Sequence, residues 1–323
     1  MRQTREPPRW YQIRLRFVLT VALIAAALFL FYRHYNPPMG SGPAGPAIPA
    51  AAFAQEWGEQ DTLLLGMGDS IVTGFGAKPG FGFFDRLARI PDGDEADIDG
   101  CSLGRVYPKL RTLNLAENSS SSGEHLHGQL PSLPRQPATT RGIVVLSTGG
   151  IDLIHDYGSS PPRDEALYGA SWADGQRYAT AFRMRLDRLL DGIAARFPGG
   201  CDIFIATIFD PTDGVGDINR VNPLLRLFKP LPPWPDGLRI HGEFNRQIRE
   251  AAAARANVHV VDVHATLLGH GMHCRDRDNP HHRAEDPTYW YFLNLEDPNR
   301  RGYDAIRRAF LLEMIPVLAP ATH

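Results

Sequence analysis

A serine that directly follows an apolar run has the position of a catalytic nucleophile. Residues 62–68 read TLLLGMG, a pattern typical of a buried strand, and Asp69 and Ser70 come next. A serine at the carboxyl end of a parallel strand lies at the open edge of the sheet, where the N–H groups of a following helix stabilise a developing oxyanion. Ser70 is therefore a candidate nucleophile, although Asp69 or Ser70 would also serve as a simple helix cap.

The glycines around Ser70 also suggest a phosphate-binding loop. A G-x-G-x-x-G motif that began at Gly66 would need glycine at the position of Ile71, so the dinucleotide pattern lacks its third element. The net charge of -2 gives no reason to expect nucleic acid, which usually calls for a basic face. The sequence therefore predicts no cofactor and no nucleic-acid partner.

A second stretch with reactive residue types, NLEDPNRRGY, lies at residues 294–303, where a helix begins. Asp at the N-cap followed by Pro at the first helical position is a favoured helix start, so capping is the main role that we expect for Asp297. A carboxylate that caps a helix is stabilised as the anion, which makes it a weaker base. The alternatives are that Asp297 orients a histidine from elsewhere in the chain, or that it acts directly as the base.

Histidines upstream of this stretch offer another general base. Five of them fall in one irregular loop, namely His264, His270, His273, His281 and His282. We expect His281 or His282 to reach Ser70, unless the loop is only a polar surface. A metal site in the run at 270–274 is a further alternative, although its H-x-x-H-C spacing matches no strong zinc signature.

Five short apolar runs predict the strands that position these side chains. Each run is nearly continuous, as expected when helices cover both faces of a parallel sheet. The runs are residues 62–68, 110–115, 142–147, 202–208 and 258–263. Helical patterns at 174–197 and 238–256 separate them, which predicts a three-layer α/β/α sandwich with about five parallel strands over residues 58–320. The irregular segments 209–237 and 268–296 are expected to form walls of a site.

The first 36 residues form a separate segment. Arginines precede an apolar run at 17–32, which predicts a cytoplasmic stub and an uncleaved transmembrane helix within 1–36, with a cleaved signal peptide or a buried helix as alternatives. Residues 37–57 are rich in Pro, Gly and Ala and read as a linker. The following domain would then lie outside the cytoplasm, where its three cysteines allow one disulfide.

The tripeptide Gly68-Asp69-Ser70, placed after the first strand, resembles block I of the SGNH (GDSL) hydrolases. The resemblance implies a flavodoxin-like fold and esterase or lipase activity, with Ser70 as the nucleophile and its backbone N–H in the oxyanion hole. Members of this family also have a glycine N–H donor after the second strand. Gly123 is the best match for that donor, and Gly150 would shape the pocket.

Two further family blocks depart from the pattern. After the third strand the family has Gly-x-Asn-Asp, in which the asparagine side chain donates to the oxyanion. Here Asp152 matches, but Ile151 replaces the asparagine. Loss of one such donor costs roughly two to three orders of magnitude in turnover. Before the last helix the family has Asp-x-x-His, and here Asn294 and Asp297 occupy the two positions.

The leading hypothesis is a membrane-anchored extracytoplasmic serine ester hydrolase of the esterase, lipase or acetylesterase type. Its substrate would be a small ester, a lipid or an acetylated glycan. The first alternative is an SGNH-fold protein of impaired activity that binds envelope glycans or lipids. The second is metal-dependent hydrolysis through the histidine loop at 264–282.

Overall fold

The computed structural model describes residues 9–35, 38–154, 167–216, 234–292 and 297–320, in two units at 1–38 and 39–323. Helix α1 (Arg9–Tyr35) makes up most of the described part of the first unit. Among the described residues, no helix is long and apolar enough to cross a membrane, so the predicted transmembrane helix is not supported. The apolar run at 17–32 has about 16 residues, fewer than the roughly 20 that a membrane span needs.

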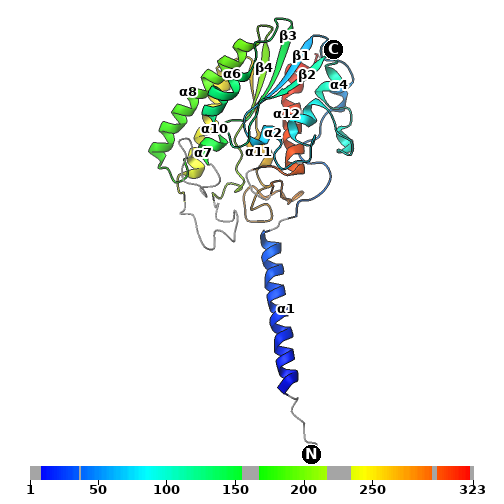
Figure 1. The fold of residues 1–323 in the computed structure, drawn as a ribbon, viewed down its shortest axis with the longest axis vertical. Coiled ribbons are helices and arrows are strands. Elements are labelled where there is room, and N and C mark those ends of the chain that lie inside the picture. Colours follow the sequence, from blue (N-terminus) through cyan, green and yellow to red (C-terminus); the bar gives the residue numbers. More distant parts are fainter. Residues whose placement is uncertain (1–8, 36–37, 155–166, 217–233, 293–296, 321–323) are drawn as a thin grey trace, which may run out of the picture. The chain divides into compact units, whose positions relative to one another are not determined.

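The second unit is built on a parallel sheet of five strands in the order β2-β1-β3-β4-β5 (Figure 1). The strands are β1 (Asp61–Met67), β2 (Leu110–Asn114), β3 (Thr140–Leu146), β4 (Cys201–Ala206) and β5 (Val258–Val261). The predicted five-stranded parallel sheet is confirmed, and each strand overlaps its predicted run. The strand order changes direction between β1 and β3, and open α/β sheets bind ligands outside the carboxyl ends of the strands at such a switch point.

Helices cover both faces of this sheet. The longer ones are α3 (Phe83–Ala88), α8 (Trp172–Arg196), α10 (Gly237–Ala253) and α12 (Arg300–Leu318). Phe182 of α8 stacks on Phe244 of α10 in one hydrophobic core, with 4.9 Å between ring centroids. Phe83 of α3 stacks on Phe310 of α12 in the second core, at 5.0 Å. The two cores lie on opposite faces of the sheet, so the predicted three-layer sandwich is confirmed (Figure 1).

Short helical segments connect the remaining elements and bring side chains to the edge of the sheet. The α-helical ones are α2 (Ser70–Thr73), α4 (Leu103–Val106), α5 (Ser122–Glu124), α6 (Leu130–Ser132), α7 (Gly150–Leu153) and α11 (Val263–Leu267). Two 3₁₀ turns are η1 (Ala50–Phe53) and η2 (Ala96–Ile98), and η3 (His125–Gln129) is a π-helix. A π-helical turn is rare and is frequently found at functional sites.

The N-cap of α12 is Asn299, which corrects the prediction that Asp297 caps this helix. The side-chain oxygen of Asn299 accepts from the backbone N–H groups of Arg301 and Gly302, at 2.9 and 3.1 Å. Its side-chain nitrogen donates to the Tyr289 carbonyl at 2.7 Å. The tertiary contact with Tyr289 fixes Asn299 in the capping position, so Asp297 lies two residues before the cap, buried in the domain.

The segment predicted as a linker packs on the domain from residue 39 onward. Ala44, Ile48, Phe53 and Trp57 are all buried in the core that contains α12. The backbone N–H of Ala44 donates to an Asp304 carboxylate oxygen at 3.0 Å. Residues 39–57 are therefore an ordered layer of the fold rather than a free tether.

The three cysteines are all buried and unpaired, so the disulfide that the sequence allows is not formed. Cys101 and Cys274 belong to the core around α12, whereas Cys201 belongs to the core on the other face of the sheet. Burial raises the pKa of all three thiols, to about 11 for Cys201 and about 12 for Cys274.

Candidate active site

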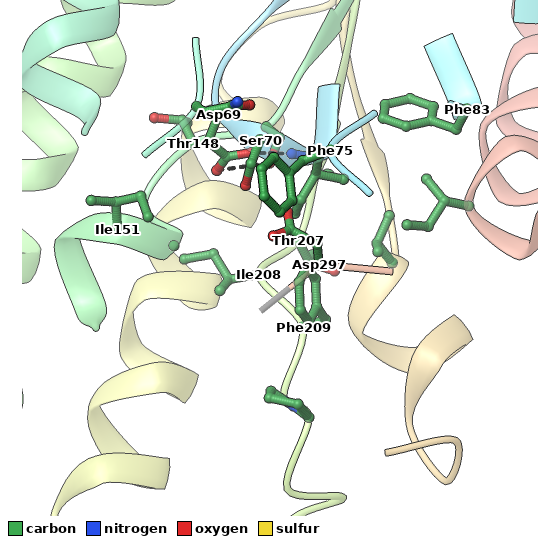
Figure 2. A pocket seen from close by; sticks show the side chains of 18 of the residues that line it. Asp69, Ser70, Phe75, Phe83, Thr148, Ile151, Thr207, Ile208, Phe209 and Asp297 are labelled. Carbon is green, nitrogen blue, oxygen red and sulfur yellow. Dashed lines mark hydrogen bonds between the residues drawn. The ribbon is translucent and has the colours of Figure 1, made fainter. Parts of the chain in front are cut away.

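A cavity of about 180 Å³ lies at the carboxyl ends of the strands, lined by residues that directly follow β1, β3, β4 and β5. Its polar lining includes Asp69, Ser70 and Asp297 (Figure 2). The apolar lining consists of Ile71, Phe75, Phe83, Ile151, Ile154, Ala206, Ile208, Phe209, Pro211, Val263, Ile306 and Phe310. The structure thus brings the predicted nucleophile together with two carboxyl groups in a mainly apolar space.

The position of Ser70 follows from a sharp turn at the end of β1. Gly68 has φ +130°, and a Cβ atom there would lie 2.1 Å from the Ser147 carbonyl oxygen, so only glycine fits. Asp69 then caps α2 by accepting from the Ile71 N–H at 3.2 Å. Ser70 is the first residue of α2, and an N–H group in the first turn of a helix has no acceptor within the helix.

Asp69 and Asp297 are both buried, with 3% and 2% of their surface exposed. Burial, and to a smaller extent the charge of Asp297, raise the pKa of Asp69 to about 7, although the hydrogen bonds from Ile71 and Ser147 oppose the shift. Ser147 donates to the other Asp69 oxygen at 3.3 Å. Asp69 is therefore partly protonated near neutral pH. It caps α2 and also interacts with the charge of Asp297.

No histidine among the described residues lines this cavity. The His282 ring bonds through Nδ1 to the Cys274 carbonyl at 2.9 Å, and the His281 ring lies beside Gly214. The structure therefore does not bring His281 or His282 to Ser70. Both histidines are close to the last helix in sequence, but they lie away from the cavity because their loop packs on residues 210–214.

The side of the cavity opposite β1 is formed by loops after β2 and β3. Ser119, in the loop after β2, lines the cavity with φ +59°, a left-handed conformation that non-glycine residues rarely adopt. Gly150 and Ile151, at the start of α7, also line it. Figure 2 shows the Ile151 side chain. Gly123 does not line it. Ser119 is thus a residue that the sequence prediction missed, because the prediction searched this loop for a glycine.

The sequence model of one protein family matches most of the chain. It describes the GDSL-like lipase/acylhydrolase family, and the match covers residues 67–305. The chain belongs to this family. The predicted resemblance is therefore confirmed, and a hydrolase fold of the lipase or esterase type is established for the GDSL domain. No curated protein gives a significant match to the sequence.

Solved structures of similar fold include three lipolytic proteins. A member of the lipolytic protein G-D-S-L family from Veillonella parvula DSM 2008 has 15% identity and a TM-score of 0.46, covering 78% of this chain and 97% of its own. The extracellular lipase from Streptomyces rimosus has 16% identity and a TM-score of 0.45, with coverage of 80% and 98%. Phospholipase A1 from Streptomyces albidoflavus NA297 has 16% identity and a TM-score of 0.41, with coverage of 79% and 97%.

Asp152 and Gly123, two other residues matched to the family blocks, do not line the cavity. Asp152 is buried, accepts from the N–H and hydroxyl of Ser122 at 2.9 and 2.5 Å, and pairs with Arg185 at 2.8 Å. It therefore joins α7 to α5 and α8 rather than facing the cavity. Gly123 directly follows Ser122 in α5, so it lies next to this contact between α5, α7 and α8. Asn294 lies outside the described residues.

The histidine loop of this GDSL protein is organised by hydrogen bonds. The His270 ring stacks on Trp290 with 3.3 Å between centroids. The buried Asp213 carboxylate accepts backbone N–H groups from Gly269, Gly271 and His273, and burial raises its pKa to about 6. In the part of the chain that the structure describes, no three His, Cys, Asp or Glu side chains are grouped as metal ligands.

Proposed function

We propose that this GDSL-family chain is a serine ester hydrolase with Ser70 as its nucleophile and Asp297 as its general base. The observation that supports the assignment is that Ser70 and Asp297 line one cavity, which no histidine of the described residues lines. Capping does not account for Asp297, because Asn299 caps α12. A buried carboxylate is also a stronger base than one in water, since burial disfavours its charge.

In the first half of the reaction, Ser70 Oγ attacks the acyl carbon while its proton passes to a carboxylate oxygen of Asp297. Backbone N–H groups of Ser70 and Ser119 hold the oxyanion, with Ser119 in the place where Gly123 was expected. The ester C–O bond then breaks, and Asp297 returns the proton to the departing alcohol. In the second half, water gives a proton to Asp297 and attacks the acyl-serine. The acyl–Oγ bond then breaks, Asp297 returns the proton to Ser70 Oγ, and the carboxylic acid is released.

The size and lining of the cavity support an ester with a short acyl chain. Its volume of about 180 Å³ is below the roughly 300–1,000 Å³ typical of pockets for drug-sized ligands. Phe75, Ile151 and Ile208 supply apolar contact surface. Among the substrates expected from the sequence, small esters and acetylated glycans therefore fit better than a long-chain lipid in the Ser70 cavity.

Location outside the cytoplasm stays a proposal that the arginine-rich start of the chain supports. Basic residues before an apolar run are typical of segments that direct export. Cell fractionation and protease protection of the full chain test the proposal, and a domain found only in the cytoplasm would contradict it.

The activity is tested with p-nitrophenyl esters of increasing acyl length, from acetate upward. We expect hydrolysis that declines with chain length and is abolished in Ser70→Ala. Asp297→Asn should lower kcat by about 10²- to 10⁴-fold, the usual contribution of a general base. Asp202→Asn, in a buried carboxylate of β4, is the matched control and should keep activity. Full activity in Ser70→Ala would exclude the serine mechanism.

A binding protein of impaired activity is the second candidate, favoured by Ile151, whose side chain offers no hydrogen bond to an oxyanion. It predicts no ester hydrolysis, with saturable binding of acetylated glycan that Ser70→Ala leaves unchanged. Loss of hydrolysis after treatment with a chelator would instead support the metal-dependent alternative.

A further inference from the structure

We propose that Gln129 is a positioning residue for Ser70, which it holds in place by binding both backbone polar groups of Gly68. The inference rests on the proposed nucleophilic role of Ser70. Gly68 lies between the end of β1 and the cap of α2, two residues before the nucleophile. The orientation of its backbone therefore sets where Ser70 enters the cavity.

The Gln129 side chain pairs with Gly68 through two hydrogen bonds. Its Nε2 donates to the Gly68 carbonyl at 2.8 Å, and its Oε1 accepts from the Gly68 N–H at 2.9 Å. Both bonds are buried, and Gln129 is only 3% exposed. One side-chain amide thus satisfies the N–H and the C=O of a single residue, as a neighbouring strand would do. The pairing also fixes which end of the amide is nitrogen.

Gly68 needs such external support because its own sterics do not hold it. A glycine populates positive and negative φ with similar ease, so local backbone preference does not select the observed φ of +130°. A side chain that would restrict the backbone is excluded by the Ser147 carbonyl, 2.1 Å from the position of a Cβ atom. Hydrogen bonds to the Gly68 peptide groups therefore select the conformation, and Gln129 supplies two of them.

Gln129 is itself held by a buried polar network. It ends the π-helix η3, and its Nε2 also lies 3.2 Å from Ser120 Oγ. The hydroxyl proton of Ser120 goes to a backbone carbonyl, at 2.7 Å for Glu117 or 2.9 Å for Gly68. Ser120 therefore accepts, rather than donates, in its 2.9 Å bond with His125 Nε2.

That assignment extends the network to the cavity wall. With its proton on Nε2, His125 accepts at Nδ1 from the Thr148 hydroxyl, at 2.8 Å. Thr148 lines the Ser70 cavity. Burial lowers the pKa of His125 to about 4, so the ring is neutral at neutral pH, even though Asp152 and Glu124 favour its charge. The network therefore keeps one hydrogen-bond pattern over the pH range in which an ester hydrolase is assayed.

Gln129 does not line the cavity, so it acts on the reaction through Gly68 and the network to Thr148 rather than by touching the substrate. Its loss should displace the Ser70 hydroxyl without altering the contacts of the acyl chain. A displacement of about 1 Å at a reacting group costs on the order of 10²-fold in rate. We therefore expect a change in kcat with little change in KM.

The test uses Gln129→Glu and Gln129→Leu in the full chain. A protonated glutamic acid can make both bonds to Gly68, whereas the ionised form offers acceptors only and repels the carbonyl. The kcat of Gln129→Glu relative to wild type should therefore fall by about tenfold or more between about pH 5 and pH 8, because burial raises a Glu pKa above its usual ~4.3. Gln129→Leu should lose about 10- to 100-fold in kcat at every pH.

Gln136→Glu is the matched control, because Gln136 is also buried but donates to the Pro134 carbonyl, and neither residue lines the Ser70 cavity. Its activity relative to wild type should not follow the profile of Gln129→Glu. Wild-type kcat in folded Gln129→Leu, or a flat ratio for folded Gln129→Glu, would overturn the inference. Folding of each variant is checked by thermal melting at each pH. If Gln129→Glu does not fold, the kcat of Gln129→Leu alone tests the inference.

Hydrogen exchange of the Gly68 amide separates this inference from the proposed function. Exchange at Gly68 should accelerate by at least about tenfold in Gln129→Leu and not in Gln136→Glu, because only the first variant loses the acceptor of that N–H. If wild type hydrolyses no ester while exchange changes as expected, the proposed function fails and the pairing with Gly68 stands. Unchanged exchange would refute the pairing whatever the activity.

Discussion

Asp69 and Asp297 line the same cavity as Ser70 and interact electrostatically, although they lie at opposite ends of the domain sequence. Burial, and then the charge of Asp297, raise the pKa of Asp69 to about 7. Below that pH the Asp69 carboxyl is mostly neutral, so a negative charge on Asp297 is not opposed by a second one. The protonation state of the helix cap Asp69 and the charge of the proposed base Asp297 are therefore coupled.

The raised pKa of Asp69 predicts a pH-dependent effect on stability. The native state holds the Asp69 proton up to about pH 7, whereas the unfolded state releases it near 3.8. The stability that this group contributes is therefore complete below pH 3.8 and is lost as pH rises through about 7. Asp69→Asn does not titrate, so its stability relative to wild type should increase across that window, by an amount on the order of a few kcal/mol.

Thermal or urea unfolding of Asp69→Asn and wild type at pH 4 to 8 measures this difference. Asp92→Asn, on the exposed surface, controls for the substitution itself. A difference from wild type that stays constant with pH would contradict the assigned pKa.

Ile151→Asn should raise kcat. Ile151 lines the cavity at the start of α7, where an asparagine amide would offer a hydrogen bond to the oxyanion. One such donor is worth about 10²- to 10³-fold when well aligned, so we expect a gain of about tenfold or more on a short ester. Ile154→Asn, in the same cavity but beyond the end of α7, should give no gain. Equal effects of the two substitutions would argue against a missing donor at position 151.

Asn299→Ala should destabilise the protein by about 1–2 kcal/mol, the usual cost of removing an N-cap. The substitution frees the N–H groups of Arg301 and Gly302 and also removes the bond to the Tyr289 carbonyl. Asn299→Asp keeps the cap acceptor but not the donor to Tyr289, so its stability should fall between those of wild type and the alanine variant. Chemical unfolding measures both, and equal stability of Asn299→Ala and wild type would disprove this role.

Arg307→Met should be strongly destabilising. Arg307 is fully buried on α12 and pairs with Asp94 at 2.5 Å and with Asp304. Removing one partner of a buried ionic group costs about 3–5 kcal/mol, because the remaining charges stay in the core. Arg249→Met, which breaks a half-exposed pair with Asp262, should cost less than about 1 kcal/mol. Similar losses in the two variants would contradict the burial argument.

The sheet was predictable because its strands are continuous apolar runs that helices cover on both faces. The site was predictable only where the backbone turn carries a signature, as at Ser70. Asp297 was misread as a cap because Asp-Pro is a strong local signal, whereas the bond between Asn299 and Tyr289 is tertiary. Ser119 was missed because its left-handed backbone is stabilised by the fold and not by its residue type.

The prediction that residues 39–57 belong to a linker was wrong for a similar reason, because composition does not reveal tertiary contacts. Their Pro-, Gly- and Ala-rich composition is typical of linkers, yet Phe53 and Trp57 supply enough apolar surface to be buried. The histidine loop gives the converse case. His281 and His282 precede the last helix in sequence, but the contacts of Asp213 with the backbone of residues 269–273 direct the loop away from the cavity.

The rates at which the three buried thiols react with a labelling reagent would report on opening of the domain. A thiol reagent attacks the thiolate, and neither exposure nor ionisation is available to Cys101, Cys201 or Cys274 in the closed fold. Labelling in the native buffer must therefore wait for a local or global opening event. Because Cys201 and the other two lie on opposite faces of the sheet, their separate labelling rates would reveal which layer of the sandwich loosens first.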